Sequence, residues 1–406
     1  MIKRFRTLLL AASLALAVPA LADDAADLNA LLAANRWEVT VTPAGLAGPG
    51  AERLLGWAEE AQFFMLGEEH GSAGIARLAT AFSRSLRRLD YRYTAIEVDP
   101  LMTELMLREL RGGTAALVRF LADGRQQAIP FYGWDAEADF VLAAMEGGGA
   151  VWGMDQSFII AAPVHFAEIA RRTRSPQVRA EAEALAKEAR ADNKFLGKVD
   201  AARLTKLRDA IPPEEADVRT IVEQLLDSAA IYAPYITNTG GYYAANLRRE
   251  TSMKRLLLTE LDKAERRDGK PAKVLFKFGA NHLMRGLSLT NVPSLGGFVS
   301  ELALSRYGKT AFNVAMLCGP GGQTRTFDGA SQTCDKDFEE SFPGLKPHLS
   351  GGVTLFDVRA LRDRPRLWKA WPEQAKSLIW AYDALAVVSG GGPSNFLAPL
   401  PAKPAQ

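Results

Sequence analysis

Phe63-Phe64-Met65-Leu66-Gly67-Glu68-Glu69-His70-Gly71 is an apolar run that reaches a glycine and then presents two carboxylates and an imidazole. The same order of residue types returns in Val274-Leu275-Phe276-Lys277-Phe278-Gly279-Ala280-Asn281-His282. Buried strands that end in this way are typical of an open α/β sheet, in which ligands bind beyond the carboxyl ends of parallel strands. Two of the four histidines therefore lie where such a sheet would carry a site.

Two segments between them have the same character. Tyr93-Thr94-Ala95-Ile96-Glu97-Val98-Asp99 closes on carboxylates, and Ala150-Val151-Trp152-Gly153-Met154-Asp155-Gln156 closes on an acid and an amide. If all four segments are strands of one parallel sheet, their polar ends meet at one edge. The side chains meeting there would be Glu68, His70, Glu97, Asp155, Asn281 and His282. We therefore predict an α/β fold with a central, mostly parallel sheet flanked by helices.

A long helical region separates the third of these strands from the fourth. It covers about residues 163–267 and includes Val178–Lys194 and Val218–Ala233, which are rich in helix formers or have apolar residues at helical spacing. Pro212-Pro213 should separate these two helices, because proline cannot continue a helix interior. We interpret the region as a helical insertion into a single α/β domain that covers residues 23–389.

Three more β-prone segments follow His282, namely Thr310–Leu317, Val353–Val358 and Ala384–Val388. They either extend the sheet or form a small antiparallel flank. Residues 390–406 are rich in Gly, Pro and Ala, and we expect them to form a flexible tail.

Residues 1–22 have the features of a signal peptide. Three cations precede an apolar run, Leu8–Val18, that is too short to span a membrane comfortably, and Ala20-Leu21-Ala22 is a small-residue cleavage pattern. We expect export to the periplasm or beyond, with a mature start near Asp23. Subtracting the three cations changes the formal net charge from +2 to −1, which argues against nucleic acid and anionic membranes as partners. No later segment is long and apolar enough for an integral membrane span.

Cys318 and Cys334 are the only cysteines. Because an exported protein meets an oxidising compartment, we expect a disulfide that closes the Gly/Thr/Ser-rich loop between them. The alternative is a pair of free thiols.

His70 follows two carboxylates, and a carboxylate that accepts one imidazole N–H leaves the other nitrogen free to take a proton from water. We therefore expect His70 to act as a general base, held by Glu68 or Glu97. The alternative is a structural histidine at a strand end whose ring nitrogens form hydrogen bonds to the backbone. Glu97 interrupts an apolar run, and a buried carboxylate needs a partner such as His or Arg.

His282 is the second candidate imidazole, and Asn281 could orient it or donate to an anion. Asp155 could bind substrate or cap the following helix, as could Asp99. Arg249 shares a helix face with Met253 and would stabilise an oxyanion if it turned towards the carboxylates, although surface charge is the commoner fate of an Arg-Arg pair. We expect His165 and His348 to be structural.

Motifs of other chemistries are absent from the sequence. It contains no G-x-S-x-G, P-loop, G-x-G-x-x-G after the first strand, H-E-x-x-H or C-x-x-C. A serine nucleophile therefore cannot be the basis of the site.

Six segments, in order, resemble the erythromycin esterase family and its broader relatives, which include the ChaN-like haem-iron uptake proteins. They are Gly67-Glu68-Glu69-His70-Gly71, Ala95-Ile96-Glu97, Tyr132-Gly133-Trp134-Asp135-Ala136-Glu137, Arg249-Glu250-Thr251-Ser252-Met253, Gly279-Ala280-Asn281-His282 and Tyr382-Asp383-Ala384-Leu385-Ala386. The resemblance implies an esterase-like α/β fold and adds Trp134 as a substrate-binding candidate. One departure is the single residue between Glu68 and His70, where the esterases usually have two, and this shorter spacing looks more like the ChaN-like branch.

Three functions are compatible with these residues. The leading expectation is an exported hydrolase that cleaves an ester or lactone of a small-molecule substrate without a cofactor, with His70, Glu68, Glu97, His282 and Arg249 as the catalytic set. The second is a divalent-metal hydrolase in which Glu68, His70, Glu97 and His282 bind Zn or Mn. The third is a periplasmic protein that binds haem or another ligand through tyrosines such as Tyr232, Tyr235, Tyr242 and Tyr243.

Overall fold

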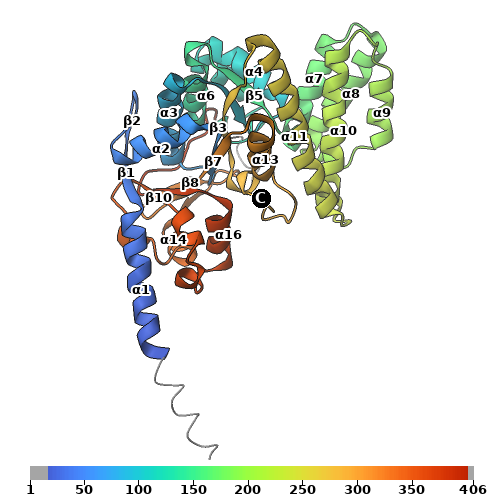
Figure 1. Cartoon of the computed structure of the whole chain (residues 1–406). Coiled ribbons are helices and arrows are strands. Elements are labelled where there is room, and N and C mark those ends of the chain that lie inside the picture. Colours follow the sequence, from blue (N-terminus) through green and yellow to red (C-terminus); the bar gives the residue numbers. More distant parts are fainter. Residues whose placement is uncertain (1–16, 401–406) are drawn as a thin grey trace, which may run out of the picture.

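The computed structural model describes residues 17–400, with side chains from Asp24 onwards. A nine-stranded sheet crosses the molecule, with helices on both of its faces (Figure 1). Its strand order is β2-β1-β10-β11-β7-β3-β6-β4-β5, and a separate two-stranded ribbon pairs β8 with β9. The strands are β1 Arg36–Thr42, β2 Gly45–Ala47, β3 Ala61–Glu68, β4 Tyr91–Ile96, β5 Ala150–Gly153, β6 Lys273–Gly279, β7 Thr310–Cys318, β8 Gln323–Arg325, β9 Ser331–Thr333, β10 Val353–Asp357 and β11 Ala384–Val388.

Six adjacent strands, from β11 to β5 in the sheet order, run parallel. This confirms the predicted α/β fold and the four strands that close on polar residues. Of the three later segments, β7 and β11 extend the parallel sheet, whereas β10 is antiparallel and belongs to a flank. Both alternatives that the sequence allowed therefore occur. Strands β1 and β2, which the sequence did not indicate, continue this antiparallel edge.

Sixteen α-helices occur in the described part of the chain. They are α1 Ala17–Ala34, α2 Pro49–Glu60, α3 Ala73–Leu86, α4 Pro100–Arg111, α5 Thr114–Ala122, α6 Asp135–Met145, α7 Ala162–Arg172, α8 Pro176–Ala191, α9 Ala201–Asp209, α10 Ala216–Thr237, α11 Tyr242–Asp268, α12 Ala280–Leu283, α13 Leu295–Tyr307, α14 Asp335–Ser341, α15 Arg359–Arg362 and α16 Glu373–Ala381.

Two apolar cores lie on opposite faces of the sheet, because successive side chains of a strand point to opposite sides. Phe64 and Leu66 of β3 belong to the core that includes helices α2, α3, α4 and α6. Phe63 and Met65 belong to the other core, with α11, α13 and α16. Since all eight residues of β3 are buried, this strand carries its polar end, Glu68, into the interior.

Helices α7 to α10 form a lobe beside the sheet domain, and the long helix α11 leads back from it (Figure 1). This lobe is the predicted insertion between the third and fourth site strands. Its helices α8 and α10 match the expected ones, but a further helix, α9, lies between α8 and the Pro212-Pro213 turn.

The described residues include only part of each end of the chain. Most of the expected signal peptide lies outside the described residues, and its expected cleavage point falls within α1. Residues 401–406 also lie outside them. The segment 390–400, expected to be flexible, instead packs on the domain, because its backbone bonds to Gly71 and Gly133 and Phe396 contacts Trp134.

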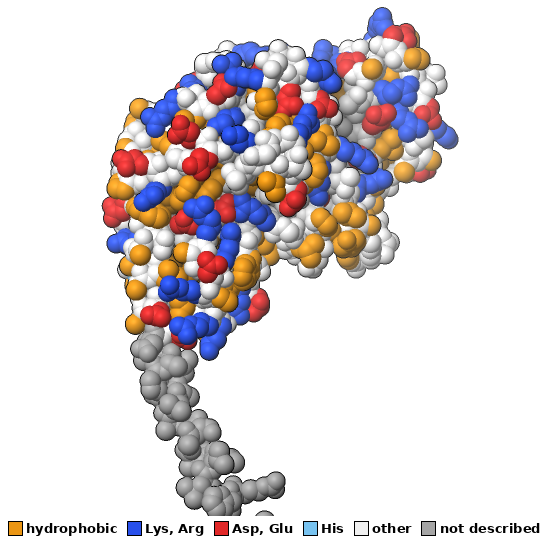
Figure 2. Space-filling view, in the orientation of Figure 1, with side chains coloured by type: hydrophobic (Ala, Val, Ile, Leu, Met, Phe, Trp, Pro, Cys, Tyr) orange, Lys and Arg blue, Asp and Glu red, His pale blue; other side chains and the backbone are white. Residues whose placement is uncertain are grey.

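Among the described helices, none combines the length and apolarity that a membrane crossing requires. On the face that Figure 2 shows, basic and acidic side chains are interspersed and do not separate into fields of one sign.

Candidate active site

A cavity of about 680 Å³ opens at the carboxyl edge of the parallel strands. Glu68, His70, Glu97, Asn281 and His282 line it, so the structure brings together the residues predicted at three of the strand ends, whereas Asp155 of the fourth does not line the cavity. The rest of the lining includes both apolar residues and further acids. The apolar ones include Met284, Leu289, Leu317, Phe338, Phe342 and Leu378, and the acids include Glu69, Asp337 and Glu340.

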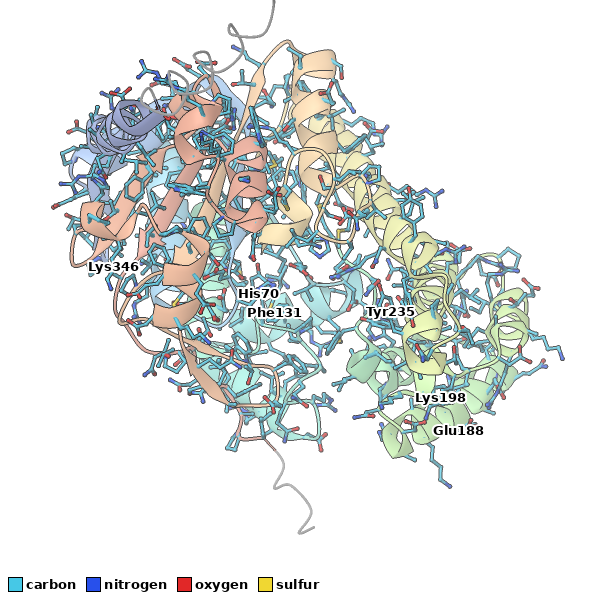
Figure 3. All side chains as sticks on the ribbon, turned by 90° about the horizontal axis from the view of Figure 1, so that it is seen from below. His70, Phe131, Glu188, Lys198, Tyr235 and Lys346 are labelled. Carbon is cyan, nitrogen blue, oxygen red and sulfur yellow. A yellow bond between two sulfur atoms is a disulfide. The ribbon has the colours of Figure 1, made fainter. Side chains whose placement is uncertain are left out.

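His70 is held on three sides. Its Nδ1 lies 2.9 Å from Glu68 Oε1, and its Nε2 lies 3.7 Å from Glu97 Oε2. The ring of Phe131 stacks on the imidazole, with 3.6 Å between ring centroids and 6° between planes, and Figure 3 shows the two residues together. Since 25 % of the His70 side chain is exposed, against 1 % for Glu68, the imidazole is the member of this pair that a ligand can reach.

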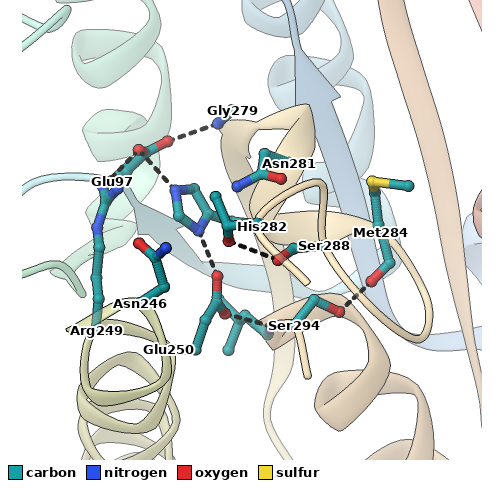
Figure 4. A network of polar contacts seen from close by, with 12 residues as sticks. Glu97, Asn246, Arg249, Glu250, Gly279, Asn281, His282, Met284, Ser288 and Ser294 are labelled. Carbon is teal, nitrogen blue, oxygen red and sulfur yellow. Dashed lines mark hydrogen bonds and ion pairs between the residues drawn. The ribbon is translucent and has the colours of Figure 1, made fainter. Parts of the chain in front are cut away.

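Glu97 is the centre of the polar network (Figure 4). Its Oε2 accepts the backbone N–H of Gly279 at 2.6 Å, and its Oε1 lies 2.9 Å from an Arg249 nitrogen and 3.4 Å from His282 Nε2. Burial opposes ionisation of this carboxyl, but His282, His70 and Arg249 together hold its pKa well below the usual range. Glu97 is therefore a carboxylate.

Position 279, just before Asn281 and His282, has no room for a side chain. A Cβ at this position would lie 2.6 Å from His70 Nε2 and 3.2 Å from Glu97 Oε2, so any side chain would displace both groups.

His282 is clamped between two carboxylates. Its Nδ1 lies 2.6 Å from Glu250 Oε1, and the other oxygen of Glu250 accepts the Leu295 N–H at 2.7 Å. Burial and the nearby Arg249 lower the pKa of His282, but Glu97 and Glu250 outweigh them and raise it to about 9. This imidazole therefore carries a positive charge at neutral pH.

Arg249 lies behind Glu97 and outside the lining of the cavity. It forms a paired contact with Asp155, at 3.0 and 2.6 Å, in addition to its bond to Glu97. The geometry gives Arg249 a contact with the predicted carboxylates and makes Asp155 its partner. Asp99 is the N-cap of α4 and also bonds to His165, which is buried, as expected for a structural histidine.

Of the predicted substrate-binding residues Asn281 and Trp134, only Asn281 lines the cavity. Asn281 lines the cavity, and its Oδ1 accepts the Leu289 N–H at 2.7 Å. Trp134 is buried behind Phe131, with ring centroids 5.6 Å apart, and does not line the cavity.

Several residues of the site were missed by the sequence analysis. Lys277 is fully buried beneath Glu68, Glu137 faces Lys277, Glu250 orients His282, and Phe131 covers His70. A signal did exist for Lys277, because a lysine inside an apolar strand requires buried carboxylates. No comparable signal marks Phe131, whose role depends on a loop conformation with φ of 60°.

Glu69 faces the cavity and bonds to the backbone N–H of Cys318 at 2.7 Å. Part of its surface is open to the cavity, yet surrounding protein atoms desolvate the carboxyl and, with a small contribution from Asp337, raise its pKa to about 7. Cys318 and Cys334 are joined in a disulfide, as predicted, and both line the same cavity.

Among the described residues, those expected to bind a metal are not grouped to hold an ion, and the tyrosines expected to bind haem are not at the cavity. Within residues 17–400, no three His, Cys, Asp or Glu side chains are grouped so that they could hold a metal ion. The tyrosines Tyr232, Tyr235, Tyr242 and Tyr243 belong to α10 and α11 and do not line the cavity.

Solved structures with a similar overall fold match nearly the whole chain. A histidine variant of erythromycin esterase EreC in its open conformation superposes with a TM-score of 0.60 over 89 % of this chain and 99 % of that chain, at 14 % identity. The chain has the erythromycin esterase fold.

The same fold recurs in two other matched structures. A succinoglycan biosynthesis protein gives a TM-score of 0.56 at 15 % identity, and a Bacillus cereus protein gives 0.54 at 17 % identity. Each covers 93 % of this chain and 99 % of its own. No family model matches the sequence, and no curated protein matches it. The erythromycin esterase fold is thus established at the level of architecture.

Proposed function

We propose that this protein is an exported hydrolase that cleaves an ester or lactone by general-base activation of water. The observation that carries the proposal is the setting of His70, which lines the cavity: one ring nitrogen meets a buried carboxylate and the other lies 3.7 Å from a second carboxylate. This arrangement fixes the tautomer that a general base needs.

The reaction begins at His70 Nε2. Glu68 accepts the Nδ1 proton, so Nε2 has a free lone pair and takes a proton from a water molecule held near Glu97. The water oxygen forms a bond to the carbonyl carbon, and the π electrons of the C=O bond move onto the carbonyl oxygen, which becomes an oxyanion. When the oxyanion collapses, the ester C–O bond breaks and the leaving alkoxide takes the proton from His70.

His282 supplies positive charge at the cavity wall. Its proton on Nε2 is shared with Glu97 in the resting geometry, and its cationic form favours negative charge developing on the substrate. Arg249 contributes through Glu97, which it holds in place from behind. General-base action and electrostatic stabilisation each supply about 3 to 5 kcal/mol in enzymes of this type.

The first test compares His70→Asn with the unchanged enzyme on a panel of esters and lactones. Turnover should fall by about two to four orders of magnitude, because a positioned base contributes that much. His348→Asn is the matched control, since His348 lies outside the cavity and bonds to Asn29. Retention of more than about a tenth of the turnover by His70→Asn would overturn the assignment.

The same panel separates the alternatives. If chelation abolishes activity reversibly, the site is a metal centre. If no ester or lactone is hydrolysed, titration with haem tests the ligand-binding alternative.

We propose the periplasm or the exterior as the location, on the strength of the leader sequence and the Cys318–Cys334 bond. Fractionation of cells that produce the full chain tests this, and protein found only in the cytoplasm would contradict it.

A further inference from the structure

Lys277 is a buried cation that the proposed reaction does not use directly. It lies on β6, between β3 and β4 in the sheet, with none of its side chain exposed. Its Nζ lies 2.6 Å from Glu68 Oε2 and 2.5 Å from Glu137 Oε2, and it faces the rings of Tyr132 and Phe140 at 5.0 and 5.2 Å. Every group around this ammonium therefore comes from the protein interior.

Glu68 is shared between Lys277 and His70. One carboxylate oxygen meets Lys277 Nζ and the other meets His70 Nδ1 at 2.9 Å. Because a carboxylate is planar, fixing one oxygen on a buried strand also fixes the direction of the other. The position of Lys277 thus sets the atom that receives the His70 proton.

An apolar residue at position 277 would be the ordinary choice for stability. Its neighbours Phe276 and Phe278 are fully buried, and a buried ion pair is often no more stable than hydrophobic residues of similar volume. Moreover, burial and the charge of Glu68 raise the pKa of Glu137 to about 7 even with Lys277 beside it. The charged cluster is therefore costly to keep.

We propose that Lys277 is a positioning residue that holds Glu68 so that its carboxylate meets Nδ1 of His70. The inference rests on the proposed function for its kinetic consequence, but the orientation of His70 can be measured without any substrate.

The experiment combines histidine ¹⁵N NMR with kinetics on Lys277→Met. His70 should be protonated on Nδ1 in the unchanged protein and should become a mixture of tautomers in Lys277→Met, because Glu68 loses the anchor for one of its oxygens. Turnover should fall about 10- to 100-fold, the range typical of a partner that orients a functional imidazole, while KM stays within about 2-fold.

Lys273→Met is the matched control. Lys273 belongs to the same strand, but its ammonium bonds to the backbone carbonyls of Ala58 and Glu59, away from the cavity. Both the His70 tautomer and turnover should stay unchanged in this variant. A loss equal to that of Lys277→Met would show a general effect of the strand and overturn the proposal.

A double variant covers the case in which Lys277→Met does not fold. Glu68→Gln combined with Lys277→Met removes both members of the pair, and if Lys277 acts through Glu68, its turnover should equal that of Glu68→Gln alone. A further loss of more than about threefold in the double variant would contradict the inference. If the unchanged protein hydrolyses no ester, the proposed function is wrong. If the His70 tautomer is unaltered in folded Lys277→Met, the positioning role of Lys277 is wrong.

Discussion

Phe131 is held in a backbone conformation that bulky residues rarely adopt. Its φ of 60° lies in the left-handed region, which costs on the order of 1 to 3 kcal/mol unless the surroundings enforce it. Trp134 and Phe327 contact the ring edge-on, at centroid distances of 5.6 and 6.4 Å, and its face lies on His70. The strain is thus associated with the one ring that fixes the plane of the imidazole.

Phe131→Leu should lower turnover by about tenfold or more, because a flexible side chain no longer restricts the plane of His70 and small misplacements of a base are costly. Steady-state kinetics with the best substrate of the ester panel measures this. Phe158→Leu is the control, since Phe158 also packs edge-on against Phe327 but has no ring contact with His70. Equal losses in the two variants would assign the effect to general packing.

The disulfide joins the end of β7 to the start of α14. Residues of α14, including Asp337, Phe338 and Ser341, line the cavity, so the bond fixes one wall of the site as well as the loop. The two cysteines are 16 positions apart, a loop for which a disulfide contributes about 3 kcal/mol.

Removing the bond in the double variant Cys318→Ser/Cys334→Ser should lower the free energy of unfolding by about 3 kcal/mol and raise KM more than it changes turnover. Denaturant unfolding and steady-state kinetics measure the two effects. Dithiothreitol should reproduce them in the unchanged protein and leave the double variant unaffected. If both thiols of the oxidised protein are alkylated without reduction, the bond does not form in solution.

Elements with a strong local signal could be predicted from the sequence. Strand β3 is buried along its whole length and reaches Gly67 next to its last residue, and β6 is buried from Val274 to Gly279, where it ends. Strand β1 was missed because it lies near the antiparallel edge, where only Val39 is buried and polar residues alternate with apolar ones. Helix α9 was missed because it has only two buried residues.

Site residues at strand ends could be predicted from the sequence, whereas site residues on helices could not. Glu68 ends β3, Glu97 directly follows β4, and His70 and His282 lie within three residues of the ends of β3 and β6. Their position in the sequence therefore indicates their position in space. Glu137 and Glu250 come from helices, and which side chain they face depends on how α6 and α11 pack on the sheet. That packing is a property of the tertiary structure and leaves no pattern in the local sequence.

Stability of the whole molecule should fall as pH rises from about 6.5 to about 9. His282 has a folded pKa of about 9, above the value near 6.5 in an unfolded chain. The folded state therefore binds the extra proton, and this stabilisation is complete below about pH 6.5 and lost as pH rises through 9. The shift corresponds to a contribution on the order of 3 kcal/mol.

Chemical denaturation across this pH range measures the effect. In His282→Asn the fall in unfolding free energy over the interval should be smaller by most of that contribution, whereas His348→Asn should follow the unchanged protein. An identical pH dependence in His282→Asn and the unchanged protein would show that His282 does not carry this charge.

The strand order also sets the time at which the sheet can form. Strand β6 pairs with both β3 and β4, which are not neighbours of each other, and β1 must wait for β10 near the other end of the chain. When the ribosome has made only the first half of the chain, β6 is not yet available to pair with β3 and β4. Their unpaired, apolar edges could then pair with strands of other chains. The central sheet is thus completed late in synthesis, and a nascent chain that is kept unfolded until Lys273–Gly279 has emerged avoids this hazard.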